Sequence, residues 1–435
     1  MRRRLTVLAA MIVLALAFSK PAAAQQRYIV VSTGGLASVL NLCSLLGCQV
    51  QGSLDGALGQ TFLITSPNVL STTLTLVESL LGIVSIEADA LLPLPQPSLS
   101  TIPSGLSDTS PVNYYGAVAT HGYAAQPAAQ IIRLQDAQNG FGISGSGIVA
   151  VIDTGVDPNH PVLYTVLLRG YDFTRNQPGA SEWLDVTGME GGYTGSGQNQ
   201  QPAFVQQSTA AVLDQSTAAV LDGTPYVAFG HGTMTSGLVH LVAPSAKILP
   251  LKAFSSNGTG YLSNIIAALY YAVQNQANVV SMSFDLSSSS SALKRAASYA
   301  NKAGVVLVAA AGNENTSSPV YPAALNGYVV GIASTSDWDT RSSFSNFGTT
   351  NVWIAAPGEN VVSTYPGATY GSESGTSFST PLVAGTVSLM LNAKQGPLNQ
   401  SQAARALANA VLLTPDLNHG RLDVYQAVSA WASTW

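Results

Sequence analysis

From residue 128 onward, short apolar runs alternate with segments whose apolar residues recur at helical spacing. The runs are rich in β-branched residues and bounded by polar turns, which is typical of the buried strands of a parallel sheet. This alternation predicts an α/β fold built on a doubly wound, mostly parallel sheet. The predicted elements are Lys247–Lys252, Asn264–Gln274, Asn278–Met282, Ala292–Lys302, Val305–Ala309, Tyr328–Ile332, Val352–Ala355 and Ser401–Ala410.

Residues 25–95 follow a different pattern and predict a separate small α+β domain. Short apolar runs predict strands, and two longer stretches have helical spacing, in an order compatible with a βαββαβ-like unit. A permanently attached accessory domain is one interpretation of this unit. The predicted strands are Arg27–Val31, Thr61–Ile64 and Ile83–Ile86, and the predicted helices are Leu36–Leu46 and Leu70–Leu81.

The chain has two cysteines, Cys43 and Cys48, both near the end of the first predicted helix. Five residues of helix rise by about 7.5 Å, which is too far for a disulfide. A bond between them therefore requires the helix to end near Gly47, a plausible C-cap.

The first 24 residues carry a targeting pattern. Arg2-Arg3-Arg4 precede the apolar run Leu5–Phe18, and Ala22-Ala23-Ala24 offers a small-residue cleavage site. The run is shorter than the roughly 20 residues that span a bilayer, so it predicts a secretory signal peptide. We expect export to the periplasm or medium without a membrane anchor. Residues 96–127 are rich in Pro, Ser and Ala and predict a linker with a maturation site.

Charge excludes one class of partner. Charged residues make up 9% of the chain, against about 25% in ordinary soluble proteins. The 17 basic and 22 acidic residues give a net charge of −5, with no basic cluster after the first four residues. Nucleic-acid binding therefore has no electrostatic support. We also expect a monomer.

A glycine-framed serine stands at a predicted helix start. The stretch Gly371–Gly385 reads GSESGTSFSTPLVAG, with Ser377 ahead of a small, apolar helical segment. A helix start offers unpaired N–H groups and the positive end of the helix dipole, which favour a developing negative charge. We place Pro381 in the first turn, where its missing N–H costs nothing. Taken alone, such a serine is more often an N-cap than a nucleophile.

Two further stretches supply the partners that a nucleophilic serine needs. Ile148–Asp157 (IVAVIDTGVD) predicts a buried strand that ends at Asp153, and Gly230–Gly237 (GHGTMTSG) predicts a helix start at His231. A neutral imidazole accepts the proton of a serine hydroxyl, and a buried carboxylate holds the imidazole in the required tautomer. The three side chains together therefore predict nucleophilic catalysis.

These stretches resemble the motifs of the subtilisin-like serine proteases (subtilases, peptidase family S8). VIDTGVD, GHGTMTSG, GTSFSTP and, from residue 309, AAAGNEN occur here in the family's order, over about residues 128–430. The resemblance implies that Ser377 is the nucleophile, His231 the general base and then acid, and Asp153 the residue that orients His231. It also implies that the Asn313 amide and the Ser377 N–H stabilise the oxyanion.

The resemblance extends to the N-terminal segment. Residues 25–95 are similar to the inhibitory propeptide of many subtilases, with Gly82–Glu87 at its last strand. This implies a self-processing precursor whose own propeptide is an intramolecular inhibitor. Residues 128–435 would form the catalytic domain, with an insert at about 175–224 that contains a tandem repeat of QSTAAVLD. We interpret the insert as a tolerated surface loop, because doubling a loop costs only about 0.6 kcal/mol in closure entropy.

The resemblance implies no required cofactor and no metal site, although calcium stays possible. The loop that holds calcium in secreted relatives, between the His231 helix and Ala243-Pro244, is short here. Val162 follows His160-Pro161 at a position where those relatives carry an acidic ligand. An evenly spaced acidic loop elsewhere could hold an ion but is usually just solvated. Its carboxylates are Glu182, Asp185 and Glu190.

The resemblance also assigns a substrate groove. Ser283-Phe284-Asp285 stands where the family has Ser, an apolar residue and Gly along the substrate backbone, and Gly258-Thr259-Gly260 would pair an extended peptide as an added strand. Ala310-Ala311-Gly312 would form the wall of the specificity pocket and Val320 its floor. A valine floor favours small or medium apolar side chains, whereas Asp285 could instead attract a basic side chain or partly block the groove.

The sequence thus predicts a secreted serine endopeptidase that works through an acyl-enzyme. Two other functions are compatible with some of its features. A catalytically silent subtilisin-like binding module is the first, since Asp285 and the insert could occlude the groove. A lipase or esterase is the second, but those enzymes use G-x-S-x-G with the nucleophile first in chain order, and Ser377 comes last here.

Overall fold

A computed structural model describes residues 25–72, 79–94, 104–186 and 226–434. The chain divides into two compact units, with the boundary in the sequence between Ala90 and Leu91. No helix within the described ranges combines the length and the apolar character that a membrane span requires.

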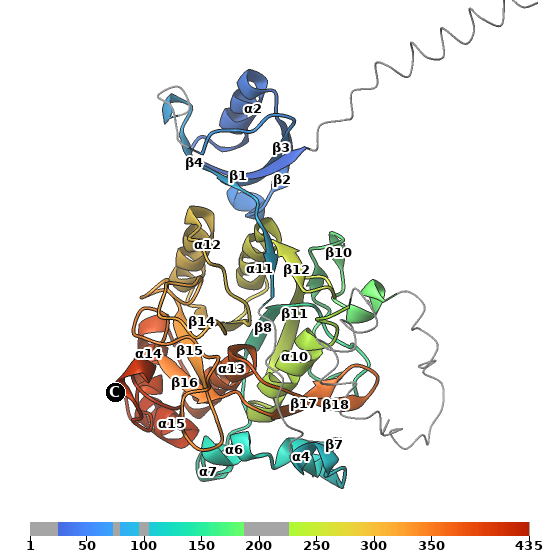
Figure 1. Ribbon diagram of the computed structural model, residues 1–435, viewed down its shortest axis with the longest axis vertical. Helices are drawn as coiled ribbons and strands as arrows, with labels where there is room; N and C mark the ends of the chain where they lie inside the picture. Colours follow the sequence, from blue (N-terminus) through green and yellow to red (C-terminus); the bar gives the residue numbers. More distant parts are fainter. Residues whose placement is uncertain (1–24, 73–78, 95–103, 187–225, 435) are drawn as a thin grey trace, which may run out of the picture. The chain divides into compact units, whose positions relative to one another are not determined.

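The described part of the first unit is a four-stranded antiparallel sheet packed with the helix α2, drawn in blue in Figure 1. The strand order is β2-β3-β1-β4. Alternate residues of β1 and β3, Tyr28 and Val30 with Phe62 and Ile64, share a core with the helix because successive side chains of a strand point to opposite faces. The elements are β1 (Gln26–Ser32), α2 (Gly35–Leu46), β2 (Gln49–Ser53), η1 (Gly56–Leu58), β3 (Thr61–Ser66) and β4 (Ile83–Ala88).

One strand of this unit was not predicted from the sequence, and one predicted helix cannot be compared with the structure. Strand β2 was not predicted, because its sequence QVQGS has a single apolar residue and forms an exposed edge. The core of the predicted helix Leu70–Leu81 lies outside the described residues, which end at 72 and resume at 79.

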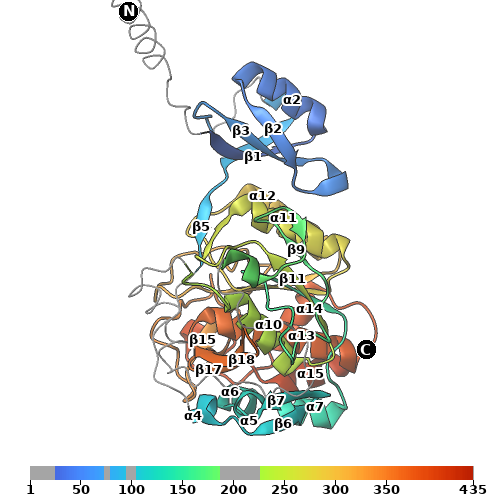
Figure 2. The same cartoon turned by 90° about the vertical axis from the view of Figure 1, so that its right-hand side faces the viewer.

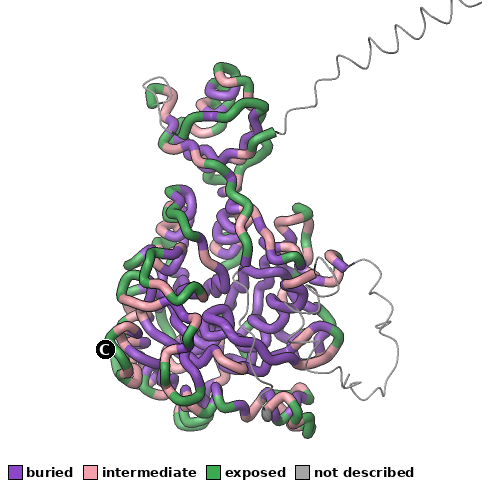
Figure 3. The backbone as a smooth tube through the Cα atoms, viewed as in Figure 1, coloured by how far each residue is buried: buried purple, intermediate pink, exposed green. Residues whose placement is uncertain are grey.

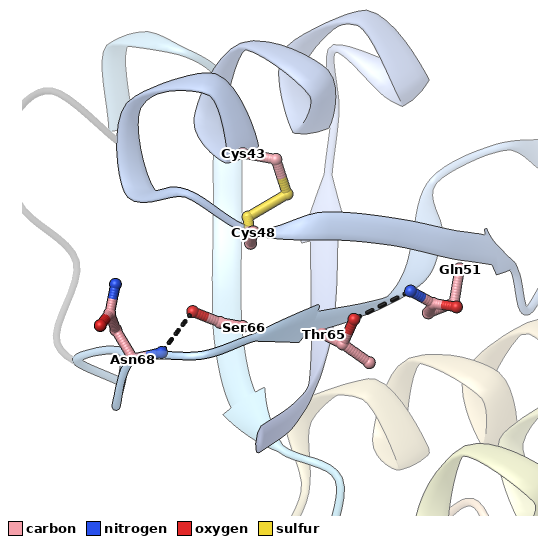
Figure 4. Close-up of a disulfide and its surroundings, with 6 residues drawn as sticks. All are labelled: Cys43, Cys48, Gln51, Thr65, Ser66 and Asn68. Atoms are coloured by element: carbon pink, nitrogen blue, oxygen red, sulfur yellow. Dashed lines mark hydrogen bonds between the residues drawn. A yellow bond between two sulfur atoms is a disulfide. The ribbon is translucent and has the colours of Figure 1, made fainter. Parts of the chain in front are cut away.

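Cys43 and Cys48 form a disulfide in this unit, with Cα atoms 4.4 Å apart (Figure 4). The helix α2 ends at Leu46, and Gly47 follows as a left-handed C-cap with φ of 71°, whose N–H donates to the Cys43 carbonyl. This turn reverses the chain and brings Cys48 back toward Cys43. The helix thus ends near Gly47, as the sequence analysis required for a disulfide between these cysteines.

The second unit contains an eight-stranded sheet in the order β10-β9-β11-β8-β13-β14-β15-β16. All neighbouring strands pair in parallel except β10 with β9, so the predicted mostly parallel α/β sheet is confirmed. The strands are β8 (Ile148–Asp153), β9 (Tyr171–Asp172), β10 (Gln177–Pro178), β11 (Lys247–Lys252), β13 (Val279–Met282), β14 (Val306–Ala310), β15 (Val330–Thr335) and β16 (Ile354–Pro357).

Helices cover both faces of this sheet (Figure 2). Val149 and Val151 of β8 share a core with α10 (His231–Val242) and α13 (Thr376–Ala393), whereas α11 (Leu262–Gln274) and α12 (Ser291–Lys302) pack on the other face. The remaining helices are α6 (Pro127–Ile131), α7 (Leu134–Phe141), α14 (Gln400–Leu407) and α15 (Val424–Ala432), and the hairpin β17 (Val361–Tyr365) and β18 (Thr369–Glu373) leads into α13.

Helices α10 and α13 form the buried centre of the unit (Figure 3). Every residue of α10 is buried, as are the first fifteen of α13, Thr376 to Met390. Their small residues allow neighbouring elements to pack closely against them. A Cβ at Gly237 of α10, for example, would lie 2.2 Å from Thr364 Oγ1 of β17. Several of their buried hydroxyls donate to backbone carbonyls, as Thr386 does to Leu382 at 2.8 Å, which offsets the cost of burying them.

The structure differs from the predicted linker. Residues 104–124 form α4 (Ser104–Ser107), the hairpin β6 (Pro111–Tyr114) and β7 (Ala117–Thr120), and α5 (His121–Ala124), all in the second unit. Tyr123 is fully buried and its hydroxyl donates to the Gly237 carbonyl at 2.7 Å. The segment has too little local periodicity to be predicted, because its order comes from packing against distant residues such as Gly237.

Candidate active site

The end of strand β8 and the start of helix α10 bring Asp153 and His231 together. His231 Nδ1 and Asp153 Oδ1 are 2.7 Å apart, and both side chains are buried. Burial disfavours the charged imidazole, but the Asp153 carboxylate outweighs it, so the pKa of His231 is raised above its ordinary value. Because Nδ1–H donates to Asp153, Nε2 is the nitrogen left to accept a proton, and it has no hydrogen-bond partner among the described residues.

Asp153 is itself held by two other donors. The Thr154 N–H donates to Oδ1 at 2.7 Å, and the Thr235 hydroxyl donates to Oδ2 at 3.1 Å. These two hydrogen bonds fix the orientation of the carboxylate. The carboxylate is therefore positioned to hold one tautomer of His231.

Ser377 is the second residue of α13, after the N-cap Gly375. The ring of the next residue, Phe378, lies 5.4 Å from the His231 ring, so the start of α13 faces the imidazole. The Ser377 hydroxyl donates to the Ser283 carbonyl at 3.2 Å and makes no hydrogen bond with His231. Catalytic hydrogen bonds are often long in free enzymes and tighten when substrate binds.

Pro381 corrects one detail of the sequence prediction. It is not in the first turn of α13 but is the sixth residue of a helix that begins at Thr376. Its missing N–H leaves the Ser377 carbonyl without its helical donor. The Ser283 hydroxyl takes that place and donates to the Ser377 carbonyl at 2.9 Å. Ser283 and Ser377 thus exchange two hydrogen bonds that tie the helix start to the end of β13.

Ser283→Ala is expected to lower the free energy of unfolding by about 1–3 kcal/mol, because it leaves the buried Ser377 carbonyl without a donor. Ser281→Ala is the matched control, since Ser281 is equally buried on β13 and its hydroxyl has no partner in the described part of the chain. Urea unfolding of both variants measures the difference. Equal losses would contradict this role of Ser283.

Asn313 lies beside the residue that precedes Ser377. Its Oδ1 accepts hydrogen bonds from the Thr376 N–H and hydroxyl, both at 2.9 Å, which fixes the orientation of the amide. Nδ2 is buried, has no partner within the described ranges, and lies 3.3 Å from where a Gly375 Cβ would be. A donor that is held in place and left free suits a developing oxyanion.

The two predicted edges of the substrate groove are Gly258–Gly260 and Ser283–Asp285, and they differ in their contacts. Thr259–Tyr261, strand β12, pairs antiparallel with β5, Leu91–Pro93, and the Leu94 N–H donates to the Gly258 carbonyl at 2.6 Å. An extended segment of the same chain therefore occupies the predicted strand-adding edge. On the other side, Phe284 is buried against Phe254, so it does not present its ring to the groove. The predicted wall and floor residues Ala310, Ala311 and Val320 are also buried.

Comparison with known proteins decides the family. Residues 145–426 match the model of the Subtilase family. The chain belongs to the subtilase family.

Two curated relatives show how far the similarity extends. This subtilase is 32% identical over 296 residues to Thermitase of Thermoactinomyces vulgaris, across 65% of its own chain and 89% of thermitase. It is 39% identical over 170 residues to Subtilisin BL of Lederbergia lenta, across 37% of its chain and 62% of that protein. It is a subtilisin-like serine endopeptidase.

Two solved structures share its fold. A cold-adapted subtilisin-like serine proteinase superposes with a TM-score of 0.50 and 28% identity, over 64% of this chain and 89% of that one. A lanthipeptide protease superposes with a TM-score of 0.54 and 22% identity, over 70% of this chain and 94% of that one, a likeness of fold alone.

Glu182 is buried beside the site. The sequence suggested this residue only as a candidate ion ligand. Its Oε1 accepts from the Thr154 hydroxyl at 2.9 Å and from the Thr233 N–H at 3.0 Å. It therefore links the end of β8 to the first turn of α10, whose N-cap Gly230 has no side chain to cap the helix. Burial raises its pKa to about 7, although Lys252 and the hydrogen bond from Thr154 oppose the shift. A lone acidic residue 29 positions after Asp153 gives no sequence signal for this contact.

Glu182→Gln is expected to shift the acid limb of kcat/KM to lower pH. The negative charge of Glu182 raises the pKa of His231, so its removal lowers that pKa, while glutamine keeps the acceptor for Thr154 and Thr233. A pH–rate profile on a peptide substrate measures the shift. Glu373→Gln is the control, because burial raises the pKa of Glu373 to about 8 without an effect on His231. An unmoved limb in Glu182→Gln would contradict the prediction.

The acidic loop gives no support to an ion site. Asp185 binds Lys252 Nζ at 2.6 Å and Arg175 at 2.5 Å, so two internal cations already balance it. Glu190 lies outside the described residues, as does the repeated stretch of the insert. No group of three or more His, Cys, Asp or Glu in the described ranges is placed to hold a metal.

Proposed function

We propose that this subtilase hydrolyses peptide bonds through an acyl-enzyme on Ser377, with His231 as base and acid and Asp153 as the group that orients it. The observation that carries the proposal is the pair of buried nitrogens without partners in the described chain, His231 Nε2 and Asn313 Nδ2. Buried polar groups are normally satisfied, so these two fit a substrate that supplies the missing partners.

The steps follow from the chemistry of these groups. The Ser377 hydroxyl oxygen attacks the substrate carbonyl carbon, and its proton passes to His231 Nε2. The oxyanion accepts hydrogen bonds from Asn313 Nδ2 and the Ser377 N–H at the start of α13. The intermediate collapses, and His231 gives the proton to the leaving amine. Water then attacks the acyl-enzyme by the same route, which frees Ser377. The scheme needs no organic cofactor.

We propose further that the protein is exported and made as a self-processing precursor. The first 24 residues have the pattern of a signal peptide, and residues 25–90 form a compact unit of their own. The next four residues lie against β12, the edge predicted to bind an extended substrate. This position supports inhibition of the enzyme by its own propeptide until the chain is cut after residue 94.

A fluorophosphonate probe tests the nucleophile on the unaltered protein. We expect one adduct per chain, mapped to Ser377 by peptide mass spectrometry, and loss of hydrolysis of a protein substrate in step with labelling. Hydrolysis that persists after full labelling would contradict the proposal. Absence of both labelling and hydrolysis after removal of residues 1–94 would favour a silent binding module.

A further inference from the structure

Two carboxyl groups meet over Gly312. A Cβ built on Gly312 would lie 2.4 Å from Asp285 Oδ2 and 2.6 Å from Glu314 Oε2. The Asp285 carboxyl also shares a hydrogen bond with that of Glu314. Both groups thus converge on the space that the missing side chain of Gly312 leaves open.

This pair lies next to the reacting groups rather than at a separate site. Asp285 is two residues after Ser283, which exchanges hydrogen bonds with Ser377. The Gly312 N–H donates to Thr376 Oγ1 at 3.2 Å, and the next residue is Asn313. Two short backbone connections therefore tie the carboxyl pair to the nucleophile and the oxyanion donor. That is the neighbourhood of the substrate residue whose carbonyl is attacked, the P1 residue.

Asp285 is half-buried and Glu314 is exposed, and the pair has no cation beside it in the described residues. Three buried carboxylates of the same unit are paired: Asp172 with Arg175 at 3.2 Å, Asp185 with Lys252 at 2.6 Å and Asp423 with Arg133 at 3.2 Å. In the described part of the chain, no Lys, Arg or His nitrogen lies within 4.0 Å of the carboxyl of Asp285 or Glu314.

A neutral amide donates to the pair. Asn346 Nδ2 donates to Glu314 Oε2 at 2.7 Å. Burial of Asp285 and its contact with Glu314 raise the pKa of Asp285 to about 7. Both effects disfavour ionisation of the Asp285 carboxyl. A protein that places two carboxyls together without a counter-ion gains most from a ligand that brings a positive charge.

We propose that Asp285 and Glu314 select substrates with lysine or arginine at P1. The proposal rests on the proposed function, because it concerns the groove beside Ser377. The long cationic side chain would lie along the groove wall and donate to both carboxyls, in a charge-assisted contact that the extended substrate backbone can reach. This replaces the apolar preference that Val320 suggested. Val320 is only 6% exposed, so its side chain offers little surface to a ligand.

The first test uses the protein without substitutions, after removal of residues 1–94 has activated it. Two peptides that differ only at P1, lysine against its uncharged analogue norleucine, are compared by kcat/KM at pH 8.5. We expect lysine to be preferred by about tenfold or more, because hydrogen bonds to charged groups contribute at that level. The preference should fall at pH 5.5, where Asp285 holds a proton. A ratio below ten at pH 8.5, or one that rises on acidification, overturns the proposal.

Substitutions at the two carboxyls distinguish an effect of their charge on lysine from a structural role. Asp285→Asn and Glu314→Gln are each expected to lower the lysine-to-norleucine ratio by about tenfold, because each removes one charged acceptor for the lysine ammonium. Asp136→Asn removes an exposed carboxylate from α7 and should leave the ratio unchanged. Equal losses for both peptides would mean a structural role and would overturn the proposal.

The outcomes also separate this inference from the proposed function. A protein that takes a fluorophosphonate adduct on Ser377 and cleaves mainly after apolar residues refutes only the P1 assignment. A protein that neither labels nor cleaves any peptide refutes the proposed function itself.

Discussion

Replacing Ser377 with alanine is expected to lower kcat on a peptide substrate by about 10⁶-fold. The size is that known for the nucleophile of subtilisin, a member of the same family, and is not computed from this geometry. The physical reason is that no acyl-enzyme forms, so only the oxyanion donors and binding remain to accelerate attack by water. Initial rates at high enzyme concentration measure the loss. A fall of less than about 10³-fold would mean that another group is the nucleophile.

The same variant tests self-processing, read from the mass of the exported chain. We expect the unaltered protein to lose the residues up to a site beyond 94 and Ser377→Ala to keep them. Ser388→Ala is the control on the same helix, because the Ser388 hydroxyl bonds the Ser146 carbonyl at 2.7 Å and lies away from the site. If Ser377→Ala is processed normally, another protease makes the cut.

Replacing Asp153 with asparagine is expected to lower kcat by about 10⁴-fold, as in the Ser-His-Asp protease where this change is known. The asparagine amide can donate to Nδ1 of His231, which moves the imidazole proton to Nε2 and removes the base from the side that faces substrate. Loss of the carboxylate also lowers the pKa of His231, because Asp153 is the main group that raises it. The remaining activity should therefore show its acid limb at lower pH.

Thr235→Val is the matched control for Asp153. It removes one donor to the carboxylate, at 3.1 Å, but leaves the charge and the bond to His231. We expect a loss of at most about tenfold, since a single hydrogen bond contributes about 1 kcal/mol. Similar losses in the two variants, measured by kcat at the pH optimum, would contradict the tautomer explanation.

The elements that repeat a simple pattern could be predicted from the sequence. Strand β11 has the predicted bounds, Lys247–Lys252, whereas β13 starts one residue later than predicted and β14 is shifted by one residue at both ends. Their apolar runs are buried on both faces, which leaves a strong signal. Strand β15 begins at Val330 rather than Tyr328, since residues 328 and 329 still belong to the preceding loop.

The candidate site could be predicted only in part. Asp153, His231, Asn313 and Ser377 stand in recognisable motifs, and the structure brings them together. The contacts of Glu182 with Thr154 and of Asp285 with Glu314 join residues 28 and 29 positions apart, and Glu182 and Asp285 lie outside the four motifs. Such contacts depend on where loops come to rest after the sheet has formed, and no local pattern encodes them.

The buried helices α10 and α13 also determine where this enzyme can vary. Their small residues are enclosed on every side, so an added methyl group anywhere along them meets a neighbour, as it would at Gly237 or Gly385. Helix α12 buries only five of its twelve residues. A library of all single substitutions should therefore show α10 and the first fifteen residues of α13 as continuous intolerant blocks. Substitutions on the open side of α12 should be neutral, and laboratory evolution of new properties will find its accepted changes there and in the groove loops.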